Sequence, residues 1–306
     1  MNTPTNAMPE ASLGAQASAP AAISEARRFC WSVRRELWEN RYLYLAPLAV
    51  AALIVVGFAL GLVALPDKLR AASALDAMQQ HERIEQPYTF AALLLMFTTF
   101  LVGMFYCLDA LYGERRDRSV LFWKSLPVSD LTTVLAKASI PFVVIPLVTW
   151  VITVVTQAIM LLLGSARLMG TGLSVWSHVS FWQMAWILFY HLVVGHGFWY
   201  APIWGWLLLC SAWSRRAPYL WATLPLLAVG LVEKIAFNTS HFGGWLAYRF
   251  MGGPEGMPPR NTPMTLAALT PPLAQFLASP GFWFGLALAA AFLAAAVRLR
   301  RYREPI

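Results

Sequence analysis

Six long apolar segments constrain the fold of this chain more than any other feature of its sequence. A helix needs about 20 apolar residues to cross a hydrocarbon core of about 30 Å. Six segments meet or approach that length: 43–65, 88–112, 134–163, 181–210, 219–237 and 282–297. Only 12% of the residues are charged, roughly half the share in a typical soluble domain. We therefore predict an all-α, polytopic membrane protein with six transmembrane helices.

The fourth segment, 181–210, is longer than one straight crossing requires and contains Gly195, Gly197 and Pro202. Glycine and proline weaken a helix locally, so this span is expected to tilt or kink.

The distribution of Lys and Arg predicts the orientation of these helices, because cytoplasmic loops of membrane proteins are enriched in both. With six crossings, one side holds most of them: Arg27, Arg28, Arg34, Arg35, Arg41, Arg115, Arg116, Arg118, Lys124, Lys137, Arg215, Arg216, Arg298, Arg300, Arg301 and Arg303. Both termini are thus expected in the cytoplasm, in a bacterial inner membrane. The net charge of +8 lies in short loops beside apolar runs. It therefore indicates topology rather than binding to nucleic acid.

The segment before the first span divides into two parts. Residues 1–22 are mostly Ala, Ser, Pro and Gly, without the basic and apolar regions of a signal peptide, and are expected to form a disordered tail. Residues 23–42 place apolar side chains at alternating spacings of three and four, with arginines off that stripe. This pattern predicts an amphipathic helix lying on the inner membrane face. A cytosolic helix packed on a partner protein is the alternative. Residues 43–306 are assigned to one six-helix transmembrane domain.

The sequence "GERRDRSVLFWKSLPVSD", residues 113–130, is the most charged stretch of the chain and joins the second and third spans. Gly113 permits a bend where the second helix leaves the bilayer, and Glu114 and Arg118 have the i, i+4 spacing of an ion pair. Pro127 ends an aromatic turn, after which Ser129 or Asp130 can cap the third span. The pattern predicts a short cytoplasmic helix with an aromatic face. On these grounds alone it transmits force between its flanking helices or merely anchors the turn.

The longer stretch "LYGERRDRSVLFWKSLPVSDLTTVLAKA", residues 111–138, resembles the permease subunits of ABC-2 type transporters. The charged "ERR..R" element and the "LPVS" turn followed by a lysine carry the resemblance. The basic entry helix, six spans and the C-terminal apolar segment agree with it, whereas the rest of the chain is similar only in pattern. In that family this loop is a coupling helix that docks into a separate ATP-binding subunit.

The resemblance implies a set of residues that contact the ATP-binding subunit: Glu114, Arg115, Arg116, Asp117, Arg118, Phe122, Trp123 and Lys124. It also implies two permease subunits, identical or different, and two ATP-binding subunits. The chain has no G-x-x-x-x-G-K-[ST] motif, so ATP and Mg²⁺ are expected in the partner and no cofactor in this chain. The implied function is transport, with export favoured over import.

Other polar residues suggest no catalytic or metal site. His191 and His196 are five apart, without the further ligands that zinc requires, and the three cysteines have no metal-ligand spacing. We expect these histidines to form a hydrogen bond within the helix bundle. Glu233 and Lys234 are expected to mark the outer end of the fifth span, with the lining of a substrate exit as the alternative. The apolar segment 238–280 is expected to form short helices at the outer leaflet.

Two other functional classes stand beside a permease. A membrane enzyme would need a convergent set of nucleophile, base or metal ligands within the spans, which the sequence does not offer. A non-transporting membrane anchor or regulatory subunit of a larger complex remains the alternative to a permease.

Overall fold

The computed structural model describes residues 24–119, 128–176, 179–251 and 277–302, and every regular element within these ranges is helical. The expected disordered tail, the loop residues Phe122, Trp123 and Lys124, and most of segment 238–280 lie outside the described residues. The predicted all-helical fold is confirmed for the part of the chain that is described.

The helix expected before the first span is α1, Glu25–Glu39. Its N-cap is Ser24, whose hydroxyl accepts a hydrogen bond from the backbone N–H of Arg27 at 3.4 Å. The side chains of Trp31 and Trp38 are 66% and 65% exposed, as suits residues at the level of lipid headgroups.

Five described helical runs are long and apolar enough to cross a membrane, and a bent pair of helices makes a sixth candidate. The first run consists of α2 (Tyr42–Gly61) and α3 (Leu65–Ser73), and the second of α4 (Ala77–Ala110) and α5 (Tyr112–Arg116). The third consists of α7 (Asp130–Ser139), the π-helix η2 (Ile140–Val144) and α8 (Ile145–Leu168). The bent pair joins α9 (Phe181–Tyr190) and the π-helix η3 (His191–Trp199) to α10 (Ala201–Trp213), and the last two runs are the single helices α11 (Pro218–Phe237) and α14 (Pro280–Tyr302). These runs coincide with the six apolar segments of the sequence.

The predicted irregularity of the fourth segment is confirmed. The helices on either side of Tyr200 meet at an angle of 46°. At Gly197 a Cβ atom would lie 2.8 Å from the carbonyl oxygen of Phe142, which is closer than real Cβ contacts allow. Glycine here lets the π-helices η2 and η3 approach each other backbone to backbone, which fixes where the bent helix lies against the third run.

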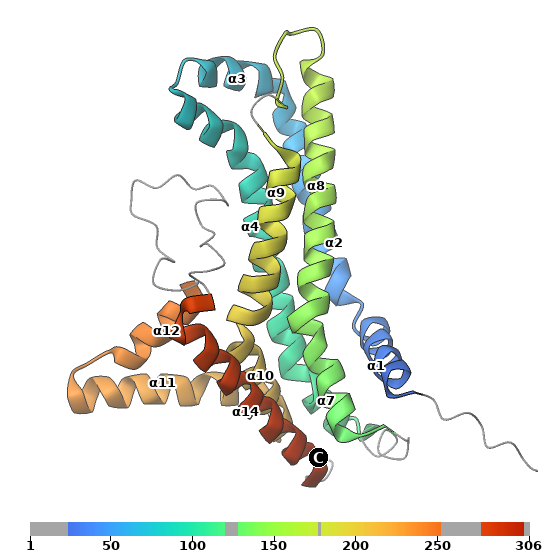
Figure 1. The fold of residues 1–306 in the computed structure, drawn as a ribbon, viewed down its shortest axis with the longest axis vertical. Coiled ribbons are helices and arrows are strands. Elements are labelled where there is room, and N and C mark those ends of the chain that lie inside the picture. Colours follow the sequence, from blue (N-terminus) through green and yellow to red (C-terminus); the bar gives the residue numbers. More distant parts are fainter. Residues whose placement is uncertain (1–23, 120–127, 177–178, 252–276, 303–306) are drawn as a thin grey trace, which may run out of the picture.

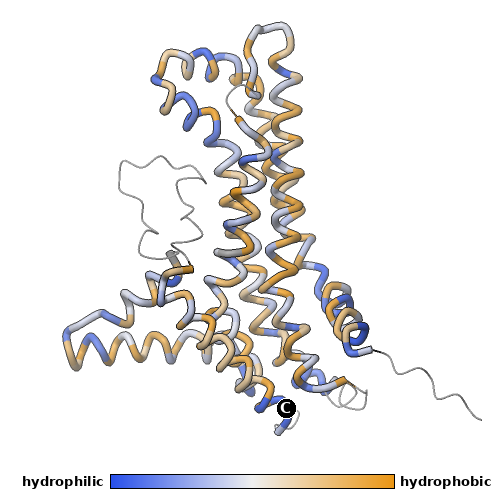
Figure 2. The backbone as a smooth tube through the Cα atoms, viewed as in Figure 1, coloured by the Kyte–Doolittle hydropathy of each residue, from blue (hydrophilic) through white to orange (hydrophobic). Residues whose placement is uncertain are grey.

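Helices α2, α4, α8 and α9 run side by side along the long axis of the molecule (Figure 1). Helix α3 and the start of α4 lie at one end. At the opposite end lie α1, the start of α7 and the end of α14, and we call this the charged end. Figure 2 shows hydrophobic residues along the length of the bundle and hydrophilic residues gathered toward these two ends.

In the view of Figure 1, the lower part of the core lies where α10 packs along α14 and against α4. Trp204 of α10 is 2% exposed and donates its indole N–H to the carbonyl of His196 at 3.0 Å. Gly205 allows close packing, since a Cβ there would lie 3.2 Å from the carbonyl oxygen of Ala289. The second run and the last helix are thus joined through α10.

Helix α11 lies across the long axis of the bundle (Figure 1), and α12 (His241–Met251) follows it. This orientation departs from the expected set of six crossings. Much of the apolar surface of α11 is exposed, including Leu227, Leu231 and Ile235. Its packing is confined to few neighbours, chiefly α10, α12 and α4, so contacts within the chain do not hold it parallel to the bundle.

Glu233 does more than mark the end of α11. Its carboxylate accepts hydrogen bonds from the backbone N–H groups of His241 and Phe242, at 2.6 and 2.8 Å, and from the Thr239 hydroxyl at 2.8 Å. The first N–H groups of a helix have no partners within it. Glu233 therefore fixes the start of α12 to the end of α11.

Candidate functional site

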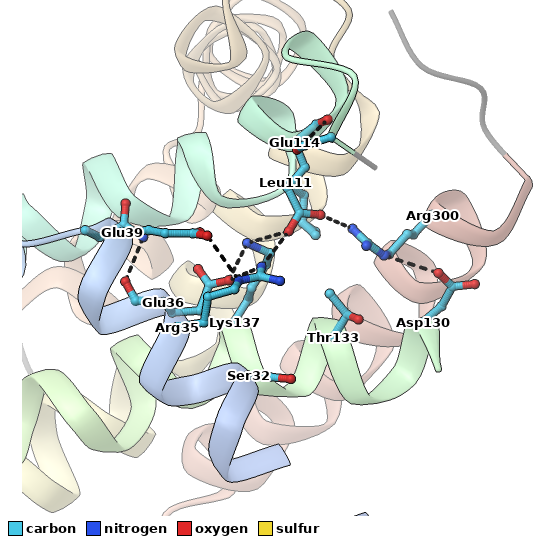
Figure 3. A network of polar contacts seen from close by, with 12 residues as sticks. Ser32, Arg35, Glu36, Glu39, Leu111, Glu114, Asp130, Thr133, Lys137 and Arg300 are labelled. Atoms are coloured by element: carbon cyan, nitrogen blue, oxygen red, sulfur yellow. Dashed lines mark hydrogen bonds and ion pairs between the residues drawn. The ribbon is translucent and has the colours of Figure 1, made fainter. Parts of the chain in front are cut away.

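A buried network of charged side chains joins four helices at the charged end (Figure 3). Its first centre is Glu36 of α1, which is 2% exposed. One carboxylate oxygen accepts hydrogen bonds from Lys137 Nζ at 2.8 Å and Arg35 Nη2 at 2.9 Å. The other accepts one from the Tyr106 hydroxyl at 2.9 Å. The carboxylate thus ties α1 to α4 and α7.

The second centre is Glu114 of the short helix α5. Its Oε1 lies 3.0 Å from Arg35 Nη2 and 3.1 Å from Lys137 Nζ, and its Oε2 pairs with Arg300 Nη1. Arg300 in turn contacts Asp130 through Nε at 3.2 Å. Glu114 is therefore shared by cations from α1, α7 and α14, helices that are far apart in the sequence.

Each central carboxylate of the network pairs with at least one cation of another helix. Three carboxylates, Glu36, Glu114 and Asp130, meet three cations, Arg35, Lys137 and Arg300. An isolated buried charge is strongly unfavourable, and loss of one partner of a buried pair costs about 3–5 kcal/mol because the other stays uncompensated. The arrangement is thus suited to holding helices in register.

Glu39 lies at the edge of this network, with Arg35 Nε 3.4 Å from its carboxylate. Partial burial raises the pKa of Glu39, while the nearby Arg35 acts in the opposite direction. Among the described residues, Arg35 therefore contacts the carboxylates of Glu36, Glu39 and Glu114.

A second attachment joins α5 to the end of α10. Arg115 Nη2 donates to the backbone carbonyls of Ser211, at 2.9 Å, and Ser214. In the reverse direction, the Ser211 hydroxyl oxygen accepts from the backbone N–H groups of Leu111 and Tyr112, at 3.0 and 2.9 Å. These N–H groups belong to the start of α5, where a helix has donors without internal acceptors.

The exposed part of the loop begins at Arg116. Its Nε lies 2.9 Å from an oxygen of Asp117, and its Nη1 lies 3.9 Å from Asp109. The hydrogen bond from Arg116 lowers the pKa of Asp117. Arg118 follows with a φ of 56°, a left-handed conformation that ends the helix.

The predicted interface residues fall into three groups. Glu114 and Arg115 are buried and are bound by the chain itself, and the expected pair between Glu114 and Arg118 is replaced by the three cations described above. Arg116, Asp117 and Arg118 are exposed. Phe122, Trp123 and Lys124 lie outside the described residues. Contact of any of the eight with an ATP-binding subunit stays a prediction.

The predicted cap of the third run is confirmed for Ser129, whose hydroxyl accepts the backbone N–H of Thr132 at 3.0 Å. Asp130, the other candidate, binds Arg300 instead. Sequence reasoning missed Glu36, Lys137 and Arg300 as members of the site. A signal was present for Lys137, since a lone lysine among apolar residues near a span usually has a specific partner.

His191 and His196 lie away from this network, with ring centroids 6.4 Å apart. His196 packs edge-on against Phe100 and Tyr200. Among the described residues there is no group of three or more His, Cys, Asp or Glu side chains that could hold a metal ion.

Comparisons with protein-family models, with curated proteins and with solved structures found no match to this chain.

Proposed function

We propose that this chain is the permease subunit of an ABC-2 type transporter, driven by a separate ATP-binding subunit that acts on the loop 113–130. The resemblance of residues 111–138 to that family is the source of the proposal. The contacts of Glu114 are the structural observation that supports it most strongly, because this one carboxylate in the loop is bonded to cations of three other helices.

This connection supports a mechanical role. A force on the loop would reach α1, α7 and α14 through Glu114, and α10 through Arg115 and Ser211. Breaking these contacts would leave buried charges without partners, so the helices are expected to move together rather than separate. Movement of the loop would therefore tilt several membrane helices at once.

The buried and exposed residues of the loop then have different roles. Arg116, Asp117 and Arg118 are exposed and would face a partner, and the family resemblance adds Phe122, Trp123 and Lys124 to this interface. Glu114 and Arg115 hold the loop on the permease. Charged residues at the rim of an interface govern specificity and association rate, whereas a buried aromatic side chain supplies most of the affinity.

The remaining parts of the proposal follow from the same family resemblance. Two permease subunits face each other and two ATP-binding subunits supply ATP hydrolysis with Mg²⁺. The charged end, rich in Lys and Arg, faces the cytoplasm, and the substrate is exported.

The test is to purify the full-length chain from its native membranes and to ask whether an ATP-hydrolysing subunit with a phosphate-binding loop accompanies it. The double variant R116A/W123A should insert normally yet lose the ATPase. The matched control K68M changes an exposed lysine at the opposite end of the molecule and should retain it. Unchanged ATPase association and transport in R116A/W123A would refute the assignment. A bound ATPase without ATP-dependent flux in reconstituted vesicles would favour the alternative, a non-transporting anchor or regulatory subunit.

A further inference from the structure

Arg249 of α12 is a buried cation in apolar surroundings, remote from the charge network. Its side chain is only 1% exposed. The guanidinium carbon lies 4.4 Å from the centre of the Trp199 ring. Among the described residues, no carboxylate lies within ion-pairing distance of it.

Neutral groups hold this guanidinium in place. Nη1 donates to the carbonyl of Trp199 at 3.3 Å and Nη2 to the carbonyl of Gly281. The Trp199 indole N–H donates back to the Arg249 carbonyl at 2.9 Å. Gly285 provides the space, since a Cβ there would lie 2.7 Å from the guanidinium carbon. Residues of α12, η3 and α14 therefore fix the position of the guanidinium.

These contacts neither neutralise the charge of the guanidinium nor use all of its N–H donors. Arginine has five N–H donors and a full positive charge that persists in protein interiors. The buried Nε of Arg249 has no hydrogen-bond partner among the described residues. Carbonyl oxygens and an aromatic face offer only partial negative charge, whereas a carboxylate or phosphate would supply a full one.

Arg249 also lines a cavity of about 660 Å³ between α4, α10, α11, α12 and α14. Its apolar wall includes Trp206, Trp245, Leu246, Phe284, Leu288 and Phe292. Among the described lining residues, Arg249 is the one that carries a charge. The volume lies within the range of about 300–1,000 Å³ in which proteins bind small ligands.

We infer that this cavity binds an anionic amphiphile, with its carboxylate or phosphate at Arg249 and its apolar body against the wall formed by α12 and α14. A single cation beside an almost wholly apolar surface matches a molecule with one anionic head and one hydrocarbon or aromatic body. A neutral apolar molecule would fill the cavity but leave the buried charge uncompensated. The proposed binding site does not depend on the proposed ATP-driven function, so either proposal can be wrong while the other is right.

The test uses the full-length chain in nanodiscs of phosphatidylcholine, whose headgroup carries no net charge. A photoreactive diazirine analogue of stearic acid labels the protein, and mass spectrometry locates the labelled residues. Oleate, oleyl alcohol and 1-oleoyl lysophosphatidate serve as competitors. Labelling should fall within the cavity wall. Both anionic competitors should displace the probe at concentrations at least ten-fold lower than the alcohol, and the better one identifies the head group.

Two variants separate the charge from the cavity. R249Q should lose the preference for oleate over oleyl alcohol, while R167Q, at an exposed arginine of α8, should keep it. L288W should reduce labelling by all probes because it fills the cavity while retaining Arg249. If R249Q does not yield a monodisperse protein, L288W and the comparison of oleate with oleyl alcohol in the unmodified chain decide the matter. Labelling outside the cavity, equal competition by acid and alcohol, or an R249Q protein that retains the preference would overturn the inference.

Discussion

Lys137 and Glu36 are separated by 101 positions in the sequence, yet Lys137 Nζ lies 2.8 Å from Glu36 Oε1, and both side chains are 3% exposed. The same ammonium group lies 3.1 Å from Glu114. One lysine thus connects the helix that precedes the first span with the loop that follows the second. The stability of the charged end should depend on it.

Replacing Lys137 with Met should destabilise the protein strongly. The variant leaves Glu36 and Glu114 short of one buried cation, a loss of about 3–5 kcal/mol by comparison with other buried pairs. Thermal unfolding of the detergent-solubilised protein measures the effect. K68M, at an exposed lysine of α3, is the matched control and should unfold like the unmodified protein.

Adding Glu36→Gln to K137M should restore part of this loss, because it removes one of the uncompensated anions. Side chains that share a network show coupling energies of about 0.5–3 kcal/mol in such double variants. Strictly additive effects of E36Q and K137M would contradict a shared network.

Glu114→Gln and Arg116→Ala should have different consequences although the residues are two positions apart. E114Q removes the charge shared by the buried Lys137 and Arg300 and the partly buried Arg35, and should lower both abundance and the unfolding temperature. R116A removes an exposed group whose ion pairs contribute at most about 1 kcal/mol. Its unfolding temperature should stay near that of the unmodified protein, while association with an ATP-binding subunit is reduced. Equal thermal stability of the two variants would show that the burial of Glu114 has no energetic importance.

Ser211→Ala should loosen the attachment of α5 to α10. The backbone N–H groups of Leu111 and Tyr112 lose their acceptor, and each buried donor left without a partner costs about 1–3 kcal/mol. Hydrogen exchange of the peptide covering residues 108–116 should accelerate. Ser73→Ala serves as control, since that hydroxyl bonds only locally, to the carbonyl of Arg70 at 2.7 Å. Unchanged exchange at 108–116 in S211A would count against this attachment.

Gly285→Ala should displace Arg249, since the added methyl group would overlap the guanidinium. Overpacking of this kind costs about 1–3 kcal/mol. Gly57→Ala is the matched control, because a Cβ at Gly57 meets nothing within 4 Å and alanine favours a helix more than glycine does. Thermal unfolding should separate the two, with G285A lower and G57A equal or higher. The opposite order would show that Arg249 is not fixed against Gly285.

Local features of this chain could be predicted because their causes lie within a few residues of one another. The length of the apolar segments predicted the membrane-length helices, Ser129 predicted the start of α7, and Gly197 with Pro202 predicted the bend in the fourth run. The side-chain spacing of residues 23–42 predicted α1. In each case a backbone preference or a helical period acts over one or two turns.

The partners of the buried charges were decided by tertiary structure alone. A helix that is apolar on all sides gives no signal of which face meets which neighbour. The sequence therefore does not predict how α4, α7 and α14 are rotated about their own axes, or how far each is shifted along the bundle. Those two quantities bring Glu36, Lys137 and Arg300 around Glu114, and place Arg249 against Trp199. The sequence by itself determined which segments are helical and apolar. Only packing decided which charges meet, because ion pairing depends on distances of a few ångströms between segments that lie far apart in the chain, such as Arg35 and Glu114, 79 positions apart, or Glu114 and Arg300, 186 positions apart.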